Sequence, residues 1–283
     1  MSKSLAALKS NLILLVRSWM GALLTQMLGP RVTAVVVDTD YGRFAIAPED
    51  YEIGHRLRKN GIYGQTELHI LDPYLTPQAR VLIVGAHIGT LAIPIAQKVA
   101  QVVAIEANPA TYSLLQMNLA LNGITNCQGI EIAASNQTET LEFLINRANS
   151  GGTKRVPKLK KFIYYYDKPE TQKIQAVSLD EYLADRDFEV ILMDIEGSEY
   201  FALLGMQRLL SKAQVLMVEF LPHHLSNVSG VTVAEFVGAI APHFSSLQIP
   251  SQEVVLTAPD FVSHLEAMAD AQQGDDSIVF TKD

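Results

Sequence analysis

The fold is decided by Arg80-Val-Leu-Ile-Val-Gly-Ala-His-Ile-Gly-Thr90 and by the stretch that follows it, Gln101-Val-Val-Ala-Ile-Glu106. Each stretch begins with a polar residue and continues as an unbroken apolar run, which is typical of a parallel strand covered on both faces. Residues 90–100 are predicted to form a helix between them, with Pro94 close enough to its start to be tolerated. Strand, helix and strand in this order predict the first unit of a parallel sheet.

The same alternation continues toward the C-terminus. Further strands are predicted at residues 130–134, 190–194, 214–220 and 277–282. A helix is predicted at Pro109–Leu121, because proline suits the first helical position. Two capping boxes, Ser178 with Glu181 and Thr232 with Glu235, predict further helix starts. The pattern as a whole predicts an α/β fold with an open, doubly wound, mostly parallel sheet.

The composition excludes several classes of protein. The chain has 283 residues, of which 48% are hydrophobic, so a wholly disordered chain is excluded. The formal net charge of −8 argues against a protein whose main task is to coat nucleic acid. Cys127 is the only cysteine, which excludes a disulfide framework and a cysteine-rich metal site. A reducing, cytoplasmic location is expected from this.

Two N-terminal parts are expected to precede a sheet domain at residues 76–283. Residues 31–75 are predicted to form a hairpin, with strands at Val32–Val37 and Gly42–Ile46, and a helical lead-in. Residues 1–30 are predicted to form one apolar helix. Its longest uncharged stretches are shorter than the roughly 18 apolar residues that a membrane-spanning helix needs. Its charged residues also interrupt the apolar centre that a signal peptide requires.

Polar residues recur about every seven positions in this helix and would form one narrow stripe. The stripe consists of Lys3, Ser4, Ser10, Asn11, Arg17, Ser18, Thr25 and Gln26. The remaining apolar side chains are expected to be buried; they include Leu12, Leu15, Val16, Trp19, Leu23 and Met27. They would pack on the body of the protein or on a second copy of the chain. Alternatively, the helix would lie in a membrane surface with Lys3, Lys9 and Arg17 at the headgroups.

Residues 146–173 interrupt the alternation of strands and helices. Basic residues exceed acidic residues by six in this segment, so the rest of the chain carries a net charge of −14. Asn149-Ser-Gly-Gly-Thr153 predicts a flexible start, and Tyr164-Tyr-Tyr166 adds aromatic side chains. The segment is therefore predicted to be an inserted loop over the edge of the sheet. It would act as a lid or as a platform for an anionic acceptor, or remain a mobile, solvated loop.

Residues that follow the first two predicted strands are typical of a nucleoside site. Ligands of such sheets bind at the carboxyl ends of the strands. Gly85 and Gly89 allow a tight turn and a close approach of a ligand to the backbone, and the helix that begins at Thr90 offers free N–H groups. Glu106 lies 21 residues after Gly85, a spacing at which an acidic residue accepts hydrogen bonds from ribose hydroxyls. The glycine pattern of dinucleotide sites is absent, which favours S-adenosylmethionine.

Carboxylates gather at the end of the fourth predicted strand. Asp194, Glu196 and Glu199 lie within six residues, where their mutual repulsion is costly for a fold that does not use them. Asp194, Glu196 and His223 are candidates for a general base. Asp194, Glu196 and Glu219 are candidate ligands for a divalent cation such as Mg²⁺. The alternative is that these acids only stabilise a helix N-terminus.

Five sequence motifs occur in a characteristic order. They are Val84-Gly-Ala-His-Ile-Gly89, Ala104-Ile-Glu-Ala-Asn-Pro109, Asn118-Leu-Ala-Leu-Asn-Gly123, Val177-Ser-Leu-Asp180 and Met193-Asp-Ile-Glu-Gly-Ser-Glu199. Together they resemble the FkbM family of S-adenosylmethionine-dependent methyltransferases. The resemblance implies a Rossmann-like class I methyltransferase fold with seven strands, of which the last, at residues 277–282, is antiparallel. It also implies methylation of hydroxyl groups, often on sugars or macrocyclic natural products.

The resemblance assigns roles to individual positions. It implies that the methionine end of the cofactor is cradled by Gly85, Ala86, His87 and Gly89. It implies that Glu106 holds the ribose, with Ala107 and Asn108 beside it. Ala134 and Ser135 would lie near the adenine, and Asp194 would lie beside the reacting methyl group.

Three positions depart from the family pattern. Many members have an acidic residue at Ile83, an asparagine at His87 and a lysine at Leu192. The absence of an acid at position 83 removes one contact to the cofactor. Leu192 removes a buried cation near Asp194. The departures suggest a divergent substrate or a weakened enzyme.

The expected function is transfer of a methyl group from S-adenosylmethionine to a hydroxyl group of a sugar or a natural-product-like small molecule. One alternative is a nucleic-acid methyltransferase that uses the basic, tyrosine-rich segment to contact RNA. Another is a catalytically weak, cofactor-binding scaffold. The expected location is cytoplasmic, with peripheral membrane contact or homodimerisation through residues 1–30.

Overall fold

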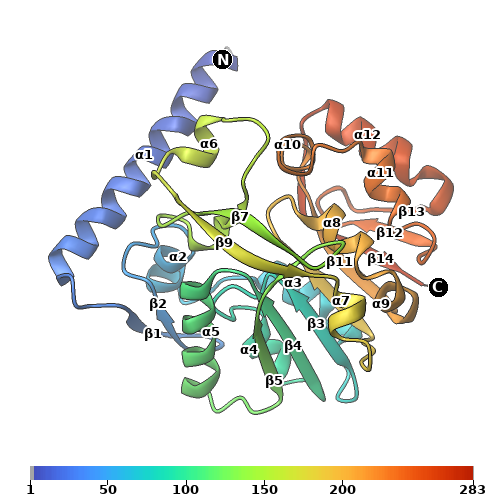
Figure 1. Ribbon diagram of the computed structural model, residues 1–283, viewed down its shortest axis with the longest axis horizontal. Helices are drawn as coiled ribbons and strands as arrows, with labels where there is room; N and C mark the ends of the chain where they lie inside the picture. Colours follow the sequence, from blue (N-terminus) through green and yellow to red (C-terminus); the bar gives the residue numbers. More distant parts are fainter. Residues whose placement is uncertain (1–2, 283) are drawn as a thin grey trace.

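The predicted strands assemble into one eight-stranded sheet in the computed structural model, which describes the backbone of residues 3–282 and the side chains of residues 8–282 (Figure 1). In spatial order the strands are β13 (Val254–Thr257), β12 (Ser246–Ile249), β14 (Asp275–Thr281), β11 (Val215–Phe220), β10 (Val190–Met193), β3 (Arg80–Val84), β4 (Gln101–Glu106) and β5 (Cys127–Glu131). Neighbouring strands from β11 to β5 pair in parallel, and β14 is antiparallel to both of its neighbours. The predicted fold class is confirmed. The eighth strand is β13, which adds an antiparallel partner to β12 at the edge.

The sheet separates two hydrophobic cores. Successive side chains of β3 point to opposite faces, so Leu82 and Val84 belong to one core and Val81 and Ile83 to the other. The first core is covered by α7 (Leu179–Tyr182), α8 (Glu199–Leu204), α9 (Gln207–Lys212), α11 (Val233–Gly238) and α12 (Phe261–Asp270). The second core is covered by the hairpin β1 (Val35–Thr39) and β2 (Gly42–Ile46), and by α2 (Ile53–Asn60), α3 (Gln65–Leu71), α4 (Ala92–Ala96) and α5 (Pro109–Leu121). Burial on both faces explains why these strands read as continuous apolar runs.

A second, four-stranded sheet crosses over the carboxyl ends of the main sheet (Figure 1). Its spatial order is β6 (Ala133–Ala134), β9 (Glu170–Val177), β7 (Glu139–Ile145) and β8 (Lys154–Arg155). The strand predicted at residues 130–134 is therefore split, because the chain passes from one sheet to the other at Ile132. β7 and β9 form a long antiparallel pair over seven residue pairs.

The prediction of an open loop at residues 146–173 is wrong. The segment contains a 3₁₀ turn at Ser150–Gly152, strand β8, helix α6 (Phe162–Tyr165) and the first residues of β9. Tyr164 is almost fully buried, and its hydroxyl donates a hydrogen bond to the carbonyl of His223 over 3.1 Å. The segment is thus folded against the main domain.

One of the two predicted helix starts and one predicted helix differ in detail from the prediction. Thr232 and Glu235 form the predicted capping box at α11. Ser178 does not cap α7, because its hydroxyl donates to the carbonyl of Gly205 over 3.0 Å. The helix predicted for residues 90–100 is reduced to α4. Its last turns are replaced by a turn in which the side-chain amide of Asn126 binds the carbonyls of Ala96 and Val99 over 2.8 and 3.0 Å.

The predicted N-terminal helix is α1 (Lys3–Leu28). Its apolar side chains do not pack on the body of the protein, which was one of the predicted alternatives: Leu12, Trp19 and Met27 are 60%, 63% and 75% exposed. Burial against a second copy or a membrane surface stays a prediction. Leu8–Leu28 is long and apolar enough to cross a membrane when up to two charged residues are tolerated in the span. The sequence prediction differed because it counted only uncharged stretches. The side chains of Lys3 and Ser4, the first members of the predicted polar stripe, lie outside the described part of the chain.

Candidate functional site

A cavity opens at the carboxyl ends of β3, β4 and β10, beneath the second sheet. Eight of the residues predicted to bind the cofactor line this cavity: Gly85, Ala86, His87, Thr90, Glu106, Ala107, Ala134 and Asp194. Gly85 has φ +92°, and a Cβ atom at this position would lie 1.8 Å from the carbonyl oxygen of Asp194. Only glycine therefore allows the turn after β3 to contact the end of β10. This contact places the glycine turn after β3 and the carboxylate of Asp194 at the same cavity.

Glu106 organises the turn after β3. Its two carboxylate oxygens accept hydrogen bonds from the backbone N–H groups of His87 and Asn108, each over 2.8 Å. Burial raises the pKa of Glu106 to about 7, although these hydrogen bonds oppose the shift. Each oxygen has a second lone pair, so the carboxyl group can still accept hydrogen bonds from a ligand.

Three buried polar atoms in the cavity wall have no hydrogen-bond partner within the described part of the protein. They are Nδ1 of His87, Oδ1 of Asn149 and Oγ of Ser198. The other ring nitrogen of His87 lies 2.6 Å from the hydroxyl of Ser150, and burial lowers the pKa of this histidine to about 4. Buried polar atoms without partners are costly. Three such atoms around one cavity therefore indicate that the cavity receives a polar ligand.

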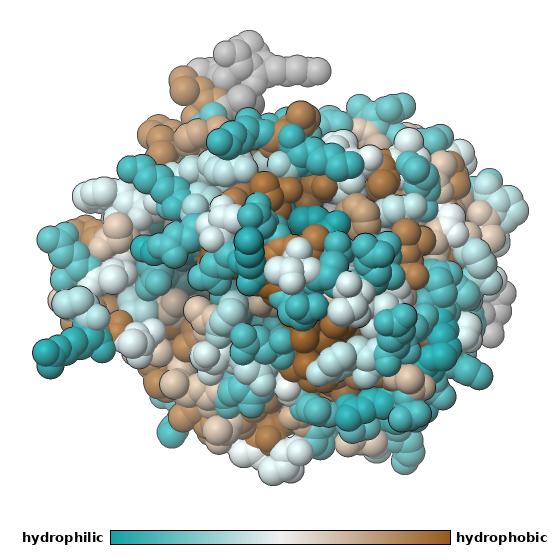
Figure 2. All heavy atoms as spheres, viewed as in Figure 1, coloured by the Kyte–Doolittle hydropathy of each residue, from teal (hydrophilic) through white to brown (hydrophobic). Residues whose placement is uncertain are grey.

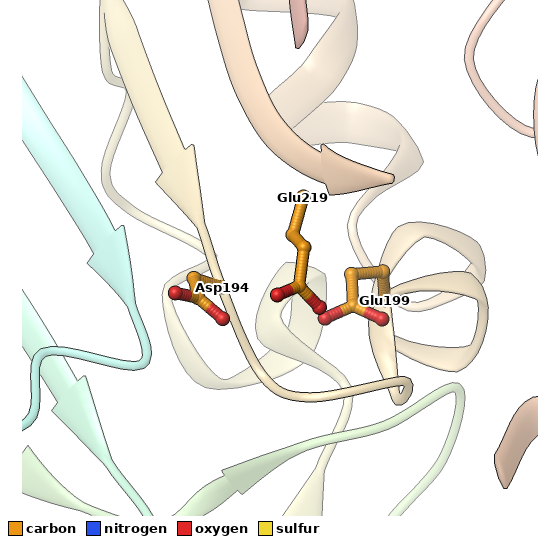
Figure 3. Close-up of side chains that lie close together, drawn as sticks. All are labelled: Asp194, Glu199 and Glu219. Carbon is orange, nitrogen blue, oxygen red and sulfur yellow. The ribbon is translucent and has the colours of Figure 1, made fainter. Parts of the chain in front are cut away.

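Asp194, Glu199 and Glu219 converge beside this cavity (Figure 3). They come from the end of β10, the start of α8 and the end of β11, and one oxygen of each lies within 4.8 Å of the others. Burial, and then the neighbouring carboxylates, raise the pKa of Asp194 and Glu219 well above the usual range, and burial raises that of Glu199 to about 7. Asp194 is nevertheless open to solvent through the cavity.

The metal-ligand prediction is only partly matched by this geometry. Glu219 joins Asp194 as predicted, but the third converging carboxylate is Glu199 and not Glu196. Glu196 turns instead toward Lys154 and His224, whose Nζ and Nε2 atoms lie 3.1 and 3.3 Å from its Oε2. Glu196 is thus occupied by a cationic and an imidazole partner.

His224, and not the predicted His223, belongs to the acidic network. Its Nδ1 lies 3.1 Å from Glu219 and its Nε2 faces Glu196. Burial, and then Lys154, lower the pKa of His224. A neutral imidazole has one donor and one acceptor nitrogen, so His224 donates to one of these two carboxyl groups and can accept a hydrogen bond from the other. His223 is half-buried, and its ring stacks on Tyr164 at 6.3 Å.

The remaining predicted residues support the cavity without lining it. Asn108 caps α5 by accepting the N–H of Ala110, and its amide donates to the hydroxyl of Thr153 over 3.1 Å. The hydroxyl of Ser135 donates to Glu139 and accepts a hydrogen bond from Arg155. Gly89, with φ +93°, lies against Leu115. These residues hold the strand ends and the second sheet in place.

Two residues of the acidic network, Lys154 and His224, are not among the candidate site residues predicted from the sequence. Lys154 lies 42 positions before Glu196, so no local spacing connects them. His224 was indistinguishable from its neighbour because the turn after β11 decides which ring points inward. A lysine within a strongly basic segment gives no sign of burial in the sequence, yet Lys154 is only 5% exposed.

Comparison with known proteins gives one family and a set of distant structures. A family model described as Methyltransferase FkbM domain matches residues 84–252, more than half of the chain. A search of curated proteins gave no match.

Three solved structures illustrate the distant similarity. Methyltransferase FkbM from Methylobacillus flagellatus KT is 18% identical over 73% of this chain and 44% of that chain, with a TM-score of 0.43. The T. thermophilus 16S rRNA methyltransferase RsmC, in complex with AdoMet and guanosine, is 14% identical over 88% and 50%, with a TM-score of 0.46. M. jannaschii TYW2 in complex with AdoMet is 16% identical over 68% and 64%, with a TM-score of 0.37. The present chain spans less than two thirds of each of these proteins.

Proposed function

Because the chain belongs to the FkbM family of methyltransferases, we propose that it transfers a methyl group from S-adenosylmethionine to a hydroxyl group of a sugar or of another small, natural-product-like acceptor. The observation that carries the proposal is the cavity at the ends of β3, β4 and β10, with its glycine turn and three unpaired polar atoms. A concave cavity lined by apolar side chains and a few polar groups is typical of sites for small molecules, including nucleoside cofactors.

The cofactor-binding residues follow from the cavity wall. Gly85, Ala86 and His87 form the turn that would hold the methionine end, with Thr90 two residues before α4. Glu106, fixed by two backbone N–H groups, would accept the ribose hydroxyls. The cofactor supplies an electrophilic methyl group, and the protein has to align the acceptor with it.

Asp194 is the best candidate for the base that receives the acceptor proton. It is the member of the carboxylate cluster that is open to the cavity, and its raised pKa makes its anion a stronger base. Glu196 also lines the cavity, but its carboxylate is already engaged by Lys154 and His224. His223 does not line the cavity. An Asp194→Asn variant should therefore lose about 10²-fold or more of turnover. Turnover with Mg²⁺ and with a chelator will decide whether a cation takes part.

A nucleic-acid acceptor has less support. The exposed lysines of residues 146–173 include Lys158, Lys160 and Lys161, none of which lines the cavity. Tyr164 is buried and so is not available to stack on a base. The segment instead contributes Asn149, Ser150 and Gly151 to the cavity wall.

Calorimetric titration with S-adenosylmethionine and S-adenosylhomocysteine tests the cofactor. We expect micromolar binding to the wild-type protein and at least tenfold weaker binding to Glu106→Ala, a loss on the order of 1.4 kcal/mol. Glu131→Ala is the matched control, because Glu131 ends the neighbouring strand opposite Glu106 and is exposed. No binding to the wild-type protein, or equal loss in both variants, would contradict the proposed site. A screen of sugar hydroxyl acceptors follows, and absence of turnover would favour the scaffold alternative.

A further inference from the structure

Helix α1 packs on the protein with a side that carries most of its polar stripe. Asn11, Arg17, Ser18 and Thr25 are half-buried, whereas Ser10 and Gln26 are exposed. Arg17 forms an ion pair with Glu52, a residue of the cavity rim. At Gly21 the helix is so close to the body that a Cβ atom would meet the carbonyl oxygen of Glu49 at 2.2 Å. A helix that only covered the protein core would be packed the other way round.

The outer side of α1 is apolar and continues onto the basic segment. Its exposed side chains are Leu8, Leu12, Ile13, Leu15, Val16, Trp19, Met27 and Leu28. Helix α6 contacts α1 (Figure 1), and the exposed apolar side chains around it are Leu159, Phe162 and Ile163. Most of the large apolar side chains exposed in the described chain lie in this one region, called here the apolar face. Figure 2 shows hydrophobic atoms beside the N-terminal residues. Water-soluble monomers rarely expose a continuous apolar area of this kind.

The border of the apolar face is positively charged. Lys9, Lys158, Lys160 and Lys161 are exposed along it. The sequence of α1 has no acidic residue, and the only acid between residues 146 and 169 is Asp167, which binds the side chain of Asn146 and the N–H groups of Arg147 and Ala148. This concentration of positive charge occurs in a chain with a net charge of −8.

We propose that the apolar face is a membrane-docking surface, with α1 lying in the plane of an anionic lipid bilayer and its lysines at the headgroups. An apolar helical face bordered by lysines is the pattern that binds anionic lipid surfaces. Its polar side remains on the protein, held by Arg17 and by the close contact at Gly21. The same contacts oppose a spanning arrangement, because the protein body covers α1 at its middle.

A second copy of the chain is a poorer occupant. In a two-fold dimer the same patch meets itself, so the border lysines of one copy would face those of the other with no carboxylate in the described part of the patch to pair with them. Like charges at an interface are costly. Anionic headgroups, in contrast, neutralise every lysine.

Trp19 provides the test, because it is the only tryptophan of the chain and is 63% exposed on the apolar face. The full chain is titrated with vesicles of phosphatidylcholine alone and of phosphatidylcholine with phosphatidylglycerol. We expect a blue shift of the tryptophan emission, and quenching by brominated lipid chains, with the anionic vesicles. Binding should weaken at high salt.

Two pairs of variants separate this surface from general effects. Lys160→Glu is compared with Lys212→Glu, an exposed lysine on α9, and Leu12→Gln with Val255→Gln, an exposed valine on β13. The first member of each pair should weaken vesicle binding at least fivefold, and the second should leave it unchanged. For the lysine variant this loss corresponds to on the order of 1 kcal/mol per charge.

Three outcomes would overturn the proposal. The first is an unchanged Trp19 emission with anionic vesicles. The second is a stable dimer in lipid-free buffer, seen by sedimentation, in which Trp19 is already shielded. The third is protein that stays on vesicles through both high-salt and alkaline washes, which would show that α1 spans the bilayer. None of these results depends on methyltransferase activity.

Discussion

At the end of β4, the carboxyl group of Glu106 has a pKa of about 7 because it is buried, whereas an unfolded chain would have a value near 4.5. The native state therefore binds an extra proton between these two values, and the stability contributed by Glu106 falls as the pH rises through this window. Glu106→Gln has no such titration. The loss of unfolding free energy in this variant should be largest below pH 4.5 and should shrink by on the order of 3 kcal/mol toward pH 7 and above.

Urea unfolding at several pH values measures this difference. Glu131→Gln serves as the control, and as an exposed substitution it should change the unfolding free energy by less than about 0.5 kcal/mol. A Glu106→Gln penalty that grows with pH would mean that the group ionises more easily in the native state than in the unfolded chain.

Single residues differed in how well the sequence predicted them. Glycines and acids that directly follow a strand, such as Gly85, Glu106 and Asp194, were placed at the cavity in advance because the end of a parallel strand determines their position. Lys154 and His224 could not be placed. Their roles depend on contacts across 42 residues and on the direction of one side chain after β11.

Between elements, the closest approach is that of the turn after β3 to the end of β10. Gly85→Ala would place a methyl group into the carbonyl of Asp194 and would also strain a backbone with φ +92°. We expect a loss of about 3 kcal/mol or more of unfolding free energy, and loss of S-adenosylhomocysteine binding. Gly123→Ala is the matched control: its φ is +62°, but nothing lies within 4 Å. It should cost about 1 kcal/mol and retain binding. Equal effects of both substitutions would exclude the close contact as their cause.

The basic segment is joined to the acidic strand end by one buried ion pair, Lys154 with Glu196. Lys154→Met and Glu196→Gln should each destabilise the protein by about 2–4 kcal/mol, because each leaves a buried group without its partner. The double variant should cost less than the sum by about 1–3 kcal/mol. Urea unfolding of all four proteins measures the coupling. Additive losses would show that the segment is held by other contacts.

Elements with strong local signals were predicted to within a few residues. β3 and α5 have the predicted bounds, and the Thr232 capping box is present. The helix at residues 90–100 and the strand at 130–134 were predicted wrongly, because distant partners decide where they end. Asn126 binds the carbonyls after α4, and β9 draws Ala133 and Ala134 into the second sheet.

At the level of the whole molecule, the alternation of strands and helices was sufficient to predict the fold class but not the surfaces. The polar stripe of α1 could be identified from the sequence, but the direction in which it points could not, because amphipathicity alone does not say which medium the apolar side meets. The secondary structure of residues 146–173 could not be predicted because the segment is strongly basic. A segment with many lysines reads as solvated, although its strand β8 pairs with β7 and its Tyr164 is buried.

The change of sheet at Ile132 links the cavity to the stability of the second sheet. Ile132, Ala133 and Ala134 form part of the cavity wall, and β6 is held by pairing with β9, from which no residue lines the cavity. A ligand that binds only to the intact cavity wall therefore also stabilises β9 against local unfolding. Backbone amides of β9 should therefore exchange with deuterium more slowly in saturating S-adenosylhomocysteine, by up to about a hundredfold at a concentration near one hundred times Kd. Amides of the distant helix α12 serve as the reference, and equal exchange of β9 with and without ligand would show that the second sheet opens independently of the cavity.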